Sequence, residues 1–467
     1  MGVNWPLWGV PVVLRVIGRT CATLSLVCAG SRQVAWGVTR WRLDIVRLML
    51  RALPVLLLAG ALLPTLALSA CGGDDPAPAT SSPSPTTPTT EGSSTAASTS
   101  LPIPRALTKN TTRIDAVDPA AVAASTALTM FPSTARDLRP EAVTLAGADD
   151  WRAILLAAPF AAKPLGFPLL LADGRNLPPV SSAALRQLQP AGAKAMNSAQ
   201  VLRIGTAARP DGMRYRYVTA TTPAGLAKAV DRQLTKQRGR ASSRILIVNS
   251  EDPASAAPAA AWAARSGDPI LFTGAGTLPA DTKEAIAEHE NPRIYVLGSS
   301  DVVSSFVIRS LKDIPGTSVY RIQPPNDDGG PADLAIEFAR YSDQDFGWNY
   351  RLPGHTFVFA PTKDPTSAMA AAALSSGGTY PALLYVDEPD HVSPALKSYL
   401  LDVQPGYDDQ HPVTQTFQNR GWLIGPTTAI EVATQARIDS LLEIIRSDNP
   451  NAIGDSADTL NAPEATP

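Results

Sequence analysis

Short apolar runs alternate with Ala-rich segments along most of the chain, and the same order of runs occurs three times after residue 106. Each copy opens with a compact run that lacks strict alternation of polar and apolar residues, which is typical of strands buried in a parallel sheet. Strands that alternate with helices favour right-handed βαβ crossovers, so each copy is expected to build one parallel sheet. These first runs are 142–146, 244–248 and 356–360.

The helices and later strands of each copy also follow one pattern. A helix of small residues comes after the first run, and small side chains let a helix lie close against a sheet. A second run follows that opens with proline, a residue that is tolerated at the first position of a strand. A third run closes on glycine. The helices begin at Ile154, Ala254 and Thr366, the second runs at Pro168, Pro269 and Pro381, and the third runs at Val201, Ile294 and Gly421.

The repeated pattern predicts an α/β fold of three tandem Rossmann-like or flavodoxin-like units with mainly parallel sheets. The expected bounds of these units are 107–213, 214–318 and 319–447. A Ser/Thr/Pro-rich stretch at 71–106 and the tail at 448–467 carry few large apolar side chains, so we expect both to be disordered.

The residues before the units have the pattern of an exported protein. A basic residue, Arg51, precedes an apolar stretch from Leu53 to Leu68 that is shorter than the roughly 20 residues of a membrane-spanning helix. The sequence that follows, Leu-Ser-Ala-Cys71, resembles the lipobox of bacterial lipoproteins, in which the cysteine receives a diacylglyceryl thioether. We therefore expect a signal peptide at 49–70 and attachment to membrane lipid through Cys71. An uncleaved signal anchor is the alternative.

The first 48 residues do not fit an ordinary signal peptide. They form a long leader with Trp and Arg residues, and translation beginning near Val46 or Met49 explains it as a start-site artefact. A genuine leader, or a membrane-associated segment around Leu7 to Ile17, is the other interpretation.

The composition of the chain argues against several classes of function. The chain has 40 basic and 42 acidic residues, a balance that offers no footprint for nucleic acid. Its three cysteines lie at positions 21, 28 and 71, so no disulfide can hold the units. Four scattered histidines, the absence of nucleotide-binding motifs and the lack of a nucleophile paired with a base lead us to expect no metal, no cofactor and no enzyme activity.

Several motifs recur at matching places in the three units. Asp252 and Asp364 precede Ala-rich helices, and a glycine ends each third strand. The other matching elements are Arg113-Ile114, Arg321-Ile322, the R-Y-V-T-A sequence from Arg216, and the helix sequence 157–161. In this order the chain from 110 to 445 resembles the cell wall-binding repeat 2 family. It departs from the family in lacking the second glycine of the L-G-G motif, and Ala153 stands where the first unit is expected to carry aspartate.

The resemblance implies a non-catalytic protein that binds an envelope polymer, often an anionic one. Together with Cys71 it predicts a lipid-anchored extracytoplasmic protein that faces the cell wall and binds a wall glycopolymer or peptidoglycan. Three such units argue against the alternative, a solute-binding lipoprotein of a transporter, which needs two lobes and a hinge. A wall hydrolase is a third possibility, for which no catalytic pair is visible.

Five side chains are candidates for polymer binding, each with a structural alternative. Arg113, Arg216 and Arg321 have the guanidinium geometry that clamps phosphate or carboxylate, and ion pairs between units explain them equally well. Asp252 and Asp364 are placed to bind sugar hydroxyls or a cation, or simply to cap the helices that follow.

Two aromatic residues and one long join complete the candidates. Tyr217 and Trp262 lie in apolar segments, where aromatic residues usually belong to the core rather than to a sugar-stacking surface. The stretch 324–354, which carries Trp348, Tyr350 and Arg351, is longer than the join usual in the family.

Replacing Cys71 with serine removes the sulfur that the lipid requires, and we expect this variant to move from the membrane fraction to the soluble fraction. Cell fractionation and immunoblotting measure the change, and Ser81→Ala serves as the control because it alters a small polar residue after the lipobox. Continued membrane retention of the Cys71→Ser variant contradicts the lipid anchor and points to the repeats or the leader.

Overall fold

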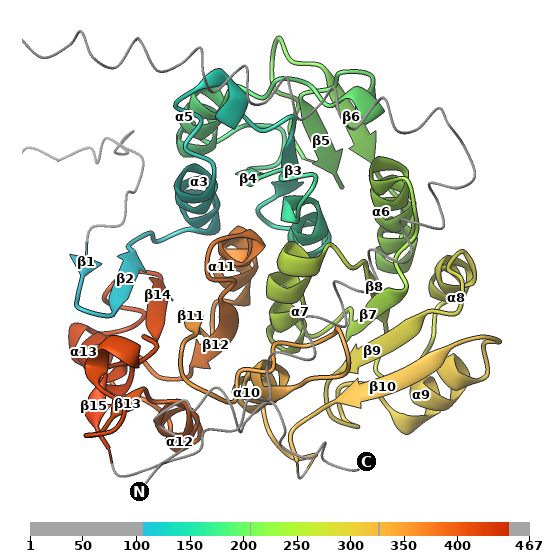
Figure 1. Cartoon of the computed structure of the whole chain (residues 1–467). Coiled ribbons are helices and arrows are strands. Elements are labelled where there is room, and N and C mark those ends of the chain that lie inside the picture. Colours follow the sequence, from blue (N-terminus) through green and yellow to red (C-terminus); the bar gives the residue numbers. More distant parts are fainter. Residues whose placement is uncertain (1–105, 206, 326, 448–467) are drawn as a thin grey trace, which may run out of the picture. The chain divides into compact units, whose positions relative to one another are not determined.

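Three mainly parallel sheets dominate the part of the chain that the structure, a computed structural model, describes (Figure 1). This part comprises residues 106–205, 207–325 and 327–447. The expected leader, signal peptide, lipidated Cys71, linker before residue 106 and tail lie outside it. Within the described ranges, no helix is long and apolar enough to cross a membrane.

The three sheets share one strand order, with the first run of each copy flanked by the second and third runs. In spatial order the first sheet contains β4 (Leu169–Ala172), β3 (Val143–Gly147), β5 (Val201–Ile204) and β6 (Tyr215–Val218). The second contains β8 (Ile270–Thr273), β7 (Arg244–Asn249), β9 (Arg293–Leu297) and β10 (Ser318–Ile322). The third contains β12 (Ala382–Val386), β11 (Thr356–Pro361), β14 (Arg420–Ile424), β2 (Thr111–Ile114) and β1 (Ala106–Leu107).

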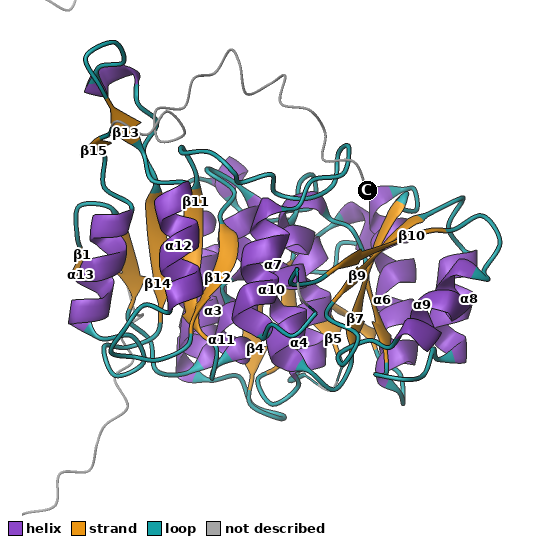
Figure 2. Ribbon diagram, turned by 90° about the horizontal axis from the view of Figure 1, so that it is seen from below, coloured by secondary structure: helices purple, strands orange, loops and turns teal. Residues whose placement is uncertain are grey.

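Neighbouring strands in these sheets are parallel, apart from the antiparallel pair β1–β2. The central strands β3, β7 and β11 are almost wholly buried, as their apolar runs predict. The predicted α/β fold with mainly parallel sheets is confirmed. A fourth, two-stranded sheet pairs β13 (Gly406–Tyr407) with β15 (Ile445–Arg446) in an arm beyond the third sheet (Figure 2).

The Ala-rich helices lie between the sheets and contact one another (Figure 1). They are α4 (Trp151–Ala157, continued by the 3-10 helix Ala158–Ala161), α7 (Pro253–Ser266) and α11 (Pro365–Ala370, followed by the 3-10 helix Ala372–Ser376). Alanine lets their backbones approach closely, and one apolar core runs through residues of all three sheets.

The remaining helices fall into three groups according to their place in each copy. Helices that open each copy are α3 (Pro119–Met130), α6 (Pro223–Arg238) and α10 (Pro331–Arg340). Those after the second strands are α5 (Pro179–Leu188), α8 (Ala280–Ala287) and α12 (Pro394–Asp402). Those after the third strands are α9 (Ser305–Lys312) and α13 (Val432–Leu441). We call α9 and α13 the closing helices.

Each sheet receives its fourth strand from another copy. β6 pairs with β5, β10 pairs with β9, and β2 pairs with β14, more than 300 residues further along the chain. The opening helices instead pack on the second strand of their own copy, so that α3 contacts β4, α6 contacts β8 and α10 contacts β12. Strand and helix of one opening segment therefore join two different sheets, and each sheet contains strands from two of the units expected from the sequence.

Side chains at the starts of the Ala-rich helices also link one copy to the next. Pro258 has no N–H to donate to the carbonyl of Ala254, and the Tyr385 hydroxyl of the third sheet donates to that oxygen over 2.7 Å. At the corresponding end of α4, Trp151 meets Phe272 of the second sheet edge to face, with ring centroids 6.0 Å apart. The helices are thus anchored on neighbouring sheets.

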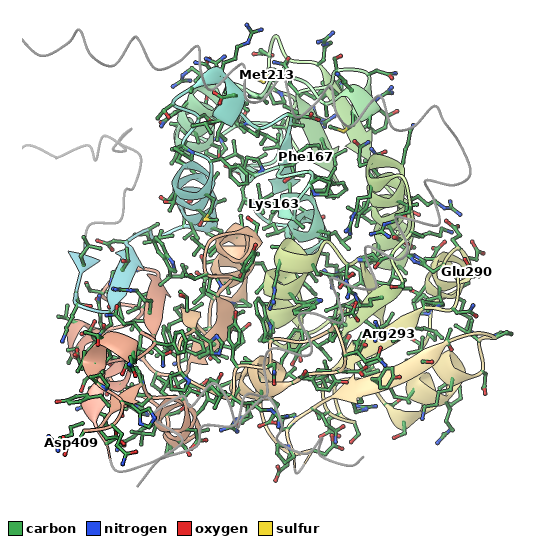
Figure 3. The ribbon with its side chains drawn as sticks, viewed as in Figure 1. Lys163, Phe167, Met213, Glu290, Arg293 and Asp409 are labelled. Atoms are coloured by element: carbon green, nitrogen blue, oxygen red, sulfur yellow. The ribbon has the colours of Figure 1, made fainter. Side chains whose placement is uncertain are left out.

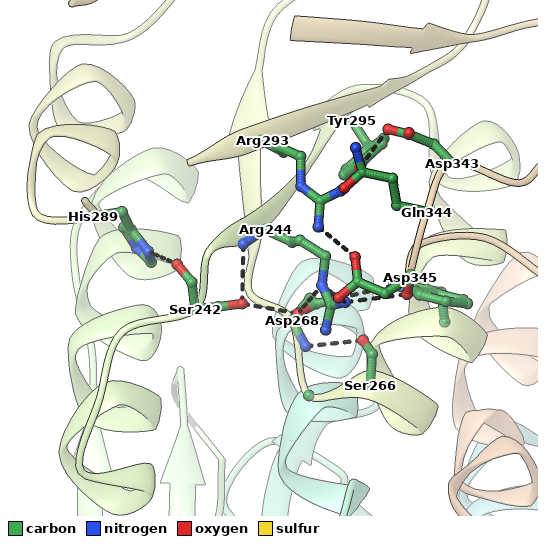
Figure 4. A network of polar contacts seen from close by, with 12 residues as sticks. Ser242, Arg244, Ser266, Asp268, His289, Arg293, Tyr295, Asp343, Gln344 and Asp345 are labelled. Atoms are coloured by element: carbon green, nitrogen blue, oxygen red, sulfur yellow. Dashed lines mark hydrogen bonds and ion pairs between the residues drawn. The ribbon is translucent and has the colours of Figure 1, made fainter. Parts of the chain in front are cut away.

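The long join before β11 is fixed to the second sheet by a polar network (Figure 4). Asp345 forms ion pairs with Arg244 and Arg293, and the Tyr295 hydroxyl donates to Asp343 over 2.8 Å. Arg244 also pairs with buried Asp268 at 3.1 Å. These contacts hold the join against the amino-terminal ends of β7 and β9.

Aromatic side chains of the same join are buried. Trp348 and Tyr350 are 4% and 6% exposed, whereas Arg351 is exposed. Trp262 lies 4.6 Å from Phe346 and 5.4 Å from Trp348 between ring centroids. The expectation that Trp262 belongs to the core is confirmed, and the join helps to build that core.

Two histidines, the buried His289 and the half-buried His355, lie in opposite electrostatic settings. The ring nitrogens of His289 lie 2.7 Å from the Ser242 carbonyl oxygen and 2.7 Å from an Asp231 carboxylate oxygen, so both nitrogens donate. Burial favours the neutral ring, but the hydrogen bond and charge of Asp231 outweigh it and raise the pKa of His289. His355 stacks on Tyr350, and burial followed by the charge of Arg265 lowers the pKa of His355 to about 4.

These shifts predict opposite pH effects on the free energy of unfolding. The stabilisation from His289 is complete below pH 6.5, the ordinary imidazole pKa, and is lost as the pH rises through the raised folded-state pKa. The stabilisation from His355 is complete above pH 6.5 and is lost as the pH falls toward 4. Urea unfolding should show that His289→Gln removes the fall in the free energy of unfolding at alkaline pH. His355→Gln should remove the fall at acidic pH. The exposed His391→Gln is the control, and identical pH curves for all variants would contradict the assignment.

Candidate binding sites at the carboxyl ends of the sheets

Arg113 points into the loop that follows β14. Its guanidinium donates to the carbonyl oxygens of Gly425 at 2.9 Å, Pro426 at 3.1 Å and Ile430 at 2.7 Å, and to the Gln435 side chain at 3.0 Å. The side chain is fully buried, and burial lowers the pKa of Arg113. The closing strand β2 therefore fixes the loop at the end of its partner strand.

Arg321 has the same role in the second sheet. From β10 it donates to the carbonyl oxygens of Gly298 at 2.9 Å and Val303 at 2.6 Å, in the loop that follows β9. Several donors held in a planar fork suit this task, because one guanidinium satisfies carbonyls that point in different directions. In both sheets, backbone carbonyls rather than carboxylates hold the arginine.

The first sheet achieves the same contact with a different residue. Tyr217 occupies the register position that holds arginine in the other two sheets, and its partner across the strands is Arg203. Arg203 donates to the carbonyl oxygens of Ala207 at 3.1 Å and Ala208 at 2.8 Å, and is only 8% exposed. In the first sheet the arginine that holds the loop therefore lies on β5 instead of β6, and Tyr217 is not needed to hold it. Sequence reasoning missed Arg203, although a basic residue inside a buried apolar run was its signal.

Tyr217 is 67% exposed, so the expectation that it belongs to the core is wrong. The reason is a missing helix. The closing helices α9 and α13 contact the fourth strands β10 and β2, whereas β5 and β6 are joined by residues 205–214 without a helix among those described. Arg216, the neighbouring residue on β6, is also exposed, and within the described residues no hydrogen bond or ion pair holds it.

Asp252 and Asp364 are the N-caps of α7 and α11. Asp252 accepts from the Ser255 N–H at 3.1 Å, and Asp364 accepts from the Ser367 N–H at 3.0 Å. Each follows the central strand of its sheet, at the edge where open α/β sheets place ligands. One oxygen of each carboxylate is thus engaged in capping.

The first sheet has the corresponding aspartate three residues before the position expected from the sequence. Asp150 caps α4 by accepting from the Ala153 N–H at 3.1 Å. The conclusion that Ala153 had replaced the aspartate was therefore wrong. The signal was the spacing itself, because an N-cap side chain bonds the N–H three residues later.

The crevice at the carboxyl end of the second sheet is small and acidic. Its volume is about 200 Å³, and its lining includes Asp252, Asp301, Asp327 and Asp328. Asp327 accepts from the Ser300 N–H at 2.7 Å, and hydrogen bonds from Ser300 lower the pKa of Asp327. Among the described residues, no group of three or more His, Cys, Asp or Glu side chains is arranged to hold a metal ion.

The crevice at the carboxyl end of the first sheet is larger and basic. Its volume is about 630 Å³, and its lining includes Arg175, Arg203, Arg209, Tyr217 and Thr219 with no carboxylate. The two crevices therefore carry opposite charge although the sheets share one topology.

Comparison with known families relates this architecture to cell walls. Residues 216–308 match the sequence profile of the family described as cell wall binding domain 2 (CWB2). Because of this match we call residues 216–308 the CWB2 segment. The segment runs from β6 into α9 and includes β7, β8 and β9, and it confirms the resemblance drawn from the sequence. A CWB2 segment supports a binding role associated with the cell wall.

Two solved structures share the fold that surrounds the CWB2 segment. Cwp6 from Clostridium difficile aligns with a TM-score of 0.55 at 14% identity over 73% of this chain and 49% of its own. Cwp8 from Clostridium difficile aligns with a TM-score of 0.53 at 17% identity over 71% of this chain and 52% of its own. The chain thus spans about half the length of each. No curated protein matches the chain in sequence.

Replacing Arg113 with glutamine should lower the free energy of unfolding by about 3 kcal/mol, because it removes charged hydrogen bonds and leaves buried carbonyls without a donor. Arg321→Gln should have a smaller effect, since Arg321 is only partly buried and donates to fewer carbonyls. The exposed Arg216→Gln is the control, with an expected change within about 0.5 kcal/mol. Equal losses for all three variants in urea unfolding would show that the carbonyl contacts do not stabilise the fold.

Proposed function

We propose that this protein is a non-catalytic, extracytoplasmic envelope protein that binds a wall glycopolymer or peptidoglycan and is held to membrane lipid through acylated Cys71. The observation that carries the proposal is the CWB2 segment at 216–308, in a body whose three sheets share one topology. The fold shared with Cwp6 and Cwp8 supports a common architecture.

The amino-terminal sequence supports the anchor. After Cys71 a linker rich in Ser, Thr and Pro leads to the body at residue 106. A flexible chain of that length has a root-mean-square span of about 35 Å. Such a tether keeps the body near the membrane while leaving it free to reach the inner surface of the wall.

We divide the candidate side chains into two roles. Arg216 is exposed and unpaired within the described residues, so it is available to a polymer. Arg113 and Arg321 act as positioning residues that hold loops at the strand ends. Asp252 and Asp364 cap helices with one oxygen, and the second oxygen is proposed to accept from sugar hydroxyls.

A solute-binding lipoprotein is less compatible with this architecture. Such a protein closes two lobes around a ligand through a hinge. The described residues instead form three sheets that exchange strands, which leaves no pair of lobes free to move apart.

Purified full chain carrying Cys71→Ser, which avoids lipid, should sediment with isolated cell walls at low salt. Walls treated with hydrofluoric acid, which cleaves phosphodiester-linked polymers, should bind less if the ligand is such a polymer and equally if it is peptidoglycan. Retention that falls with added salt indicates charged contacts. Protein that stays in the supernatant with both wall preparations at low salt overturns the binding role.

A further inference from the structure

The first sheet lacks the helix that closes the other two. In the second and third sheets a closing helix follows the third strand and contacts the fourth strand, as α9 contacts β10 and α13 contacts β2. In the first sheet only residues 205–214 connect β5 to β6, with no helix among those described. Figure 3 labels Met213, which lies in this connection at the outer end of the first sheet.

The missing helix leaves a hollow that we call the open-sheet pocket, with a volume of about 630 Å³. Arg175 enters it from the loop after β4, Arg209 from the short connection, and Tyr217 and Thr219 from the end of β6. Ligand pockets for small molecules typically measure about 300 to 1,000 Å³. The open-sheet pocket is therefore large enough for one or two sugar rings.

The segment of sequence that supplies most of the pocket lining is rich in basic residues, although the whole chain is balanced. Residues 173–219 contain the basic residues Arg175, Arg186, Lys194, Arg203, Arg209, Arg214 and Arg216 and the acidic residues Asp173 and Asp211. The whole chain has 40 basic and 42 acidic residues, so the segment departs strongly from the average. The three arginines of the pocket lining, Arg175, Arg203 and Arg209, make an anionic ligand the favoured occupant.

The arginines of the pocket are available to a ligand. Arg175 and Arg209 are exposed, and within the described residues neither forms an ion pair. Arg203 lies beneath them, held by loop carbonyls, and its guanidinium carbon is 5.0 Å from the centre of the Tyr215 ring. Burial and then the charge of Arg209 lower the pKa of Arg203, and Tyr215 acts in the opposite direction.

We propose that the open-sheet pocket binds an acidic sugar unit, one that carries a carboxylate or a phosphate. Arg175 and Arg209 donate charge-assisted hydrogen bonds to the anion. The exposed Tyr217 ring packs against the apolar face of the sugar, and the Thr219 hydroxyl bonds a sugar hydroxyl. The inference rests on the proposed function for its biological ligand, an acidic unit of the wall polymer.

One such site per chain is expected. In the other two sheets the register position of Tyr217 is held by Arg113 or Arg321, and a closing helix contacts the strand that carries it. The crevice of the second sheet is acidic and repels the same ligand. The three copies have therefore diverged, and the first one carries the anion site.

Calorimetric titration of full chain carrying Cys71→Ser tests the site with defined probes. Digalacturonate supplies a carboxylate sugar and glucose 1-phosphate a phosphate sugar, while cellobiose and inorganic phosphate each supply half of the recognition. At least one acidic sugar should bind at one site per chain, about tenfold or more tighter than cellobiose and inorganic phosphate, and more weakly as salt is added. Equal affinity for an acidic sugar and cellobiose, or for an acidic sugar and inorganic phosphate, overturns the proposal.

Substitutions locate the site. Arg175→Gln, Arg209→Gln and Tyr217→Thr should each weaken binding of the acidic sugar about tenfold, since each removes one ligand contact. Arg309→Gln in α9 also removes an exposed arginine, but in a closed sheet, and should leave the affinity unchanged. Unfolding midpoints confirm that the variants fold. Wild-type affinity in all three pocket variants, or an equal loss in Arg309→Gln, places the ligand elsewhere.

Wall sedimentation of the Arg175→Gln/Arg209→Gln double variant separates this inference from the proposed function. Loss of both sugar binding and wall retention supports the two together. If the chain with both pocket arginines intact is retained on walls but binds none of the acidic sugars, the open-sheet pocket is overturned and the wall-binding role stands. If that chain binds an acidic sugar at the pocket but does not sediment with walls, only the wall-binding role is overturned.

Discussion

The exchange of opening strands is the constraint on which the rest of the structure depends. Each sheet is completed by a strand from another copy, and the pairing of β2 with β14 completes the last one with residues from the start of the body. No copy is therefore whole without its neighbours. The alanines of α4, α7 and α11 permit the close contact that the exchange requires, because larger side chains would hold the helices apart.

The same exchange places function at the strand ends. A strand arriving from another copy carries Arg113 or Arg321 to the loop of its partner strand, so each arginine couples strand pairing to loop geometry. In the first sheet this coupling passes to Arg203, and the vacated position displays Tyr217 to solvent. In the first sheet the loop is thus supported by Arg203 on β5, and the connection to β6 has no helix among the described residues. Tyr217 on β6 is therefore on a surface that a ligand can reach.

Local pattern made the strands and Ala-rich helices predictable, because the runs 244–248 and 356–360 are apolar enough to require burial wherever they lie. Which sheet an opening strand joins could not be predicted, since that choice depends on pairing between distant residues. Tyr217 was misjudged for a related reason, because its exposure depends on a helix absent from a neighbouring connection. Arg113 and Arg321 were expected to bind polymer or to form ion pairs between units, whereas their carbonyl partners lie in loops that only the fold brings near.

The position of β2 has a mechanical consequence. The chain that is proposed to descend from the membrane enters the body through β1 and β2, and β2 pairs along its length with β14. Tension between membrane and wall would load these hydrogen bonds first, before any other part of the fold. The strand that completes the architecture is thus also where such a force would enter the fold, and the buried guanidinium of Arg113 on that strand would help to hold it in place.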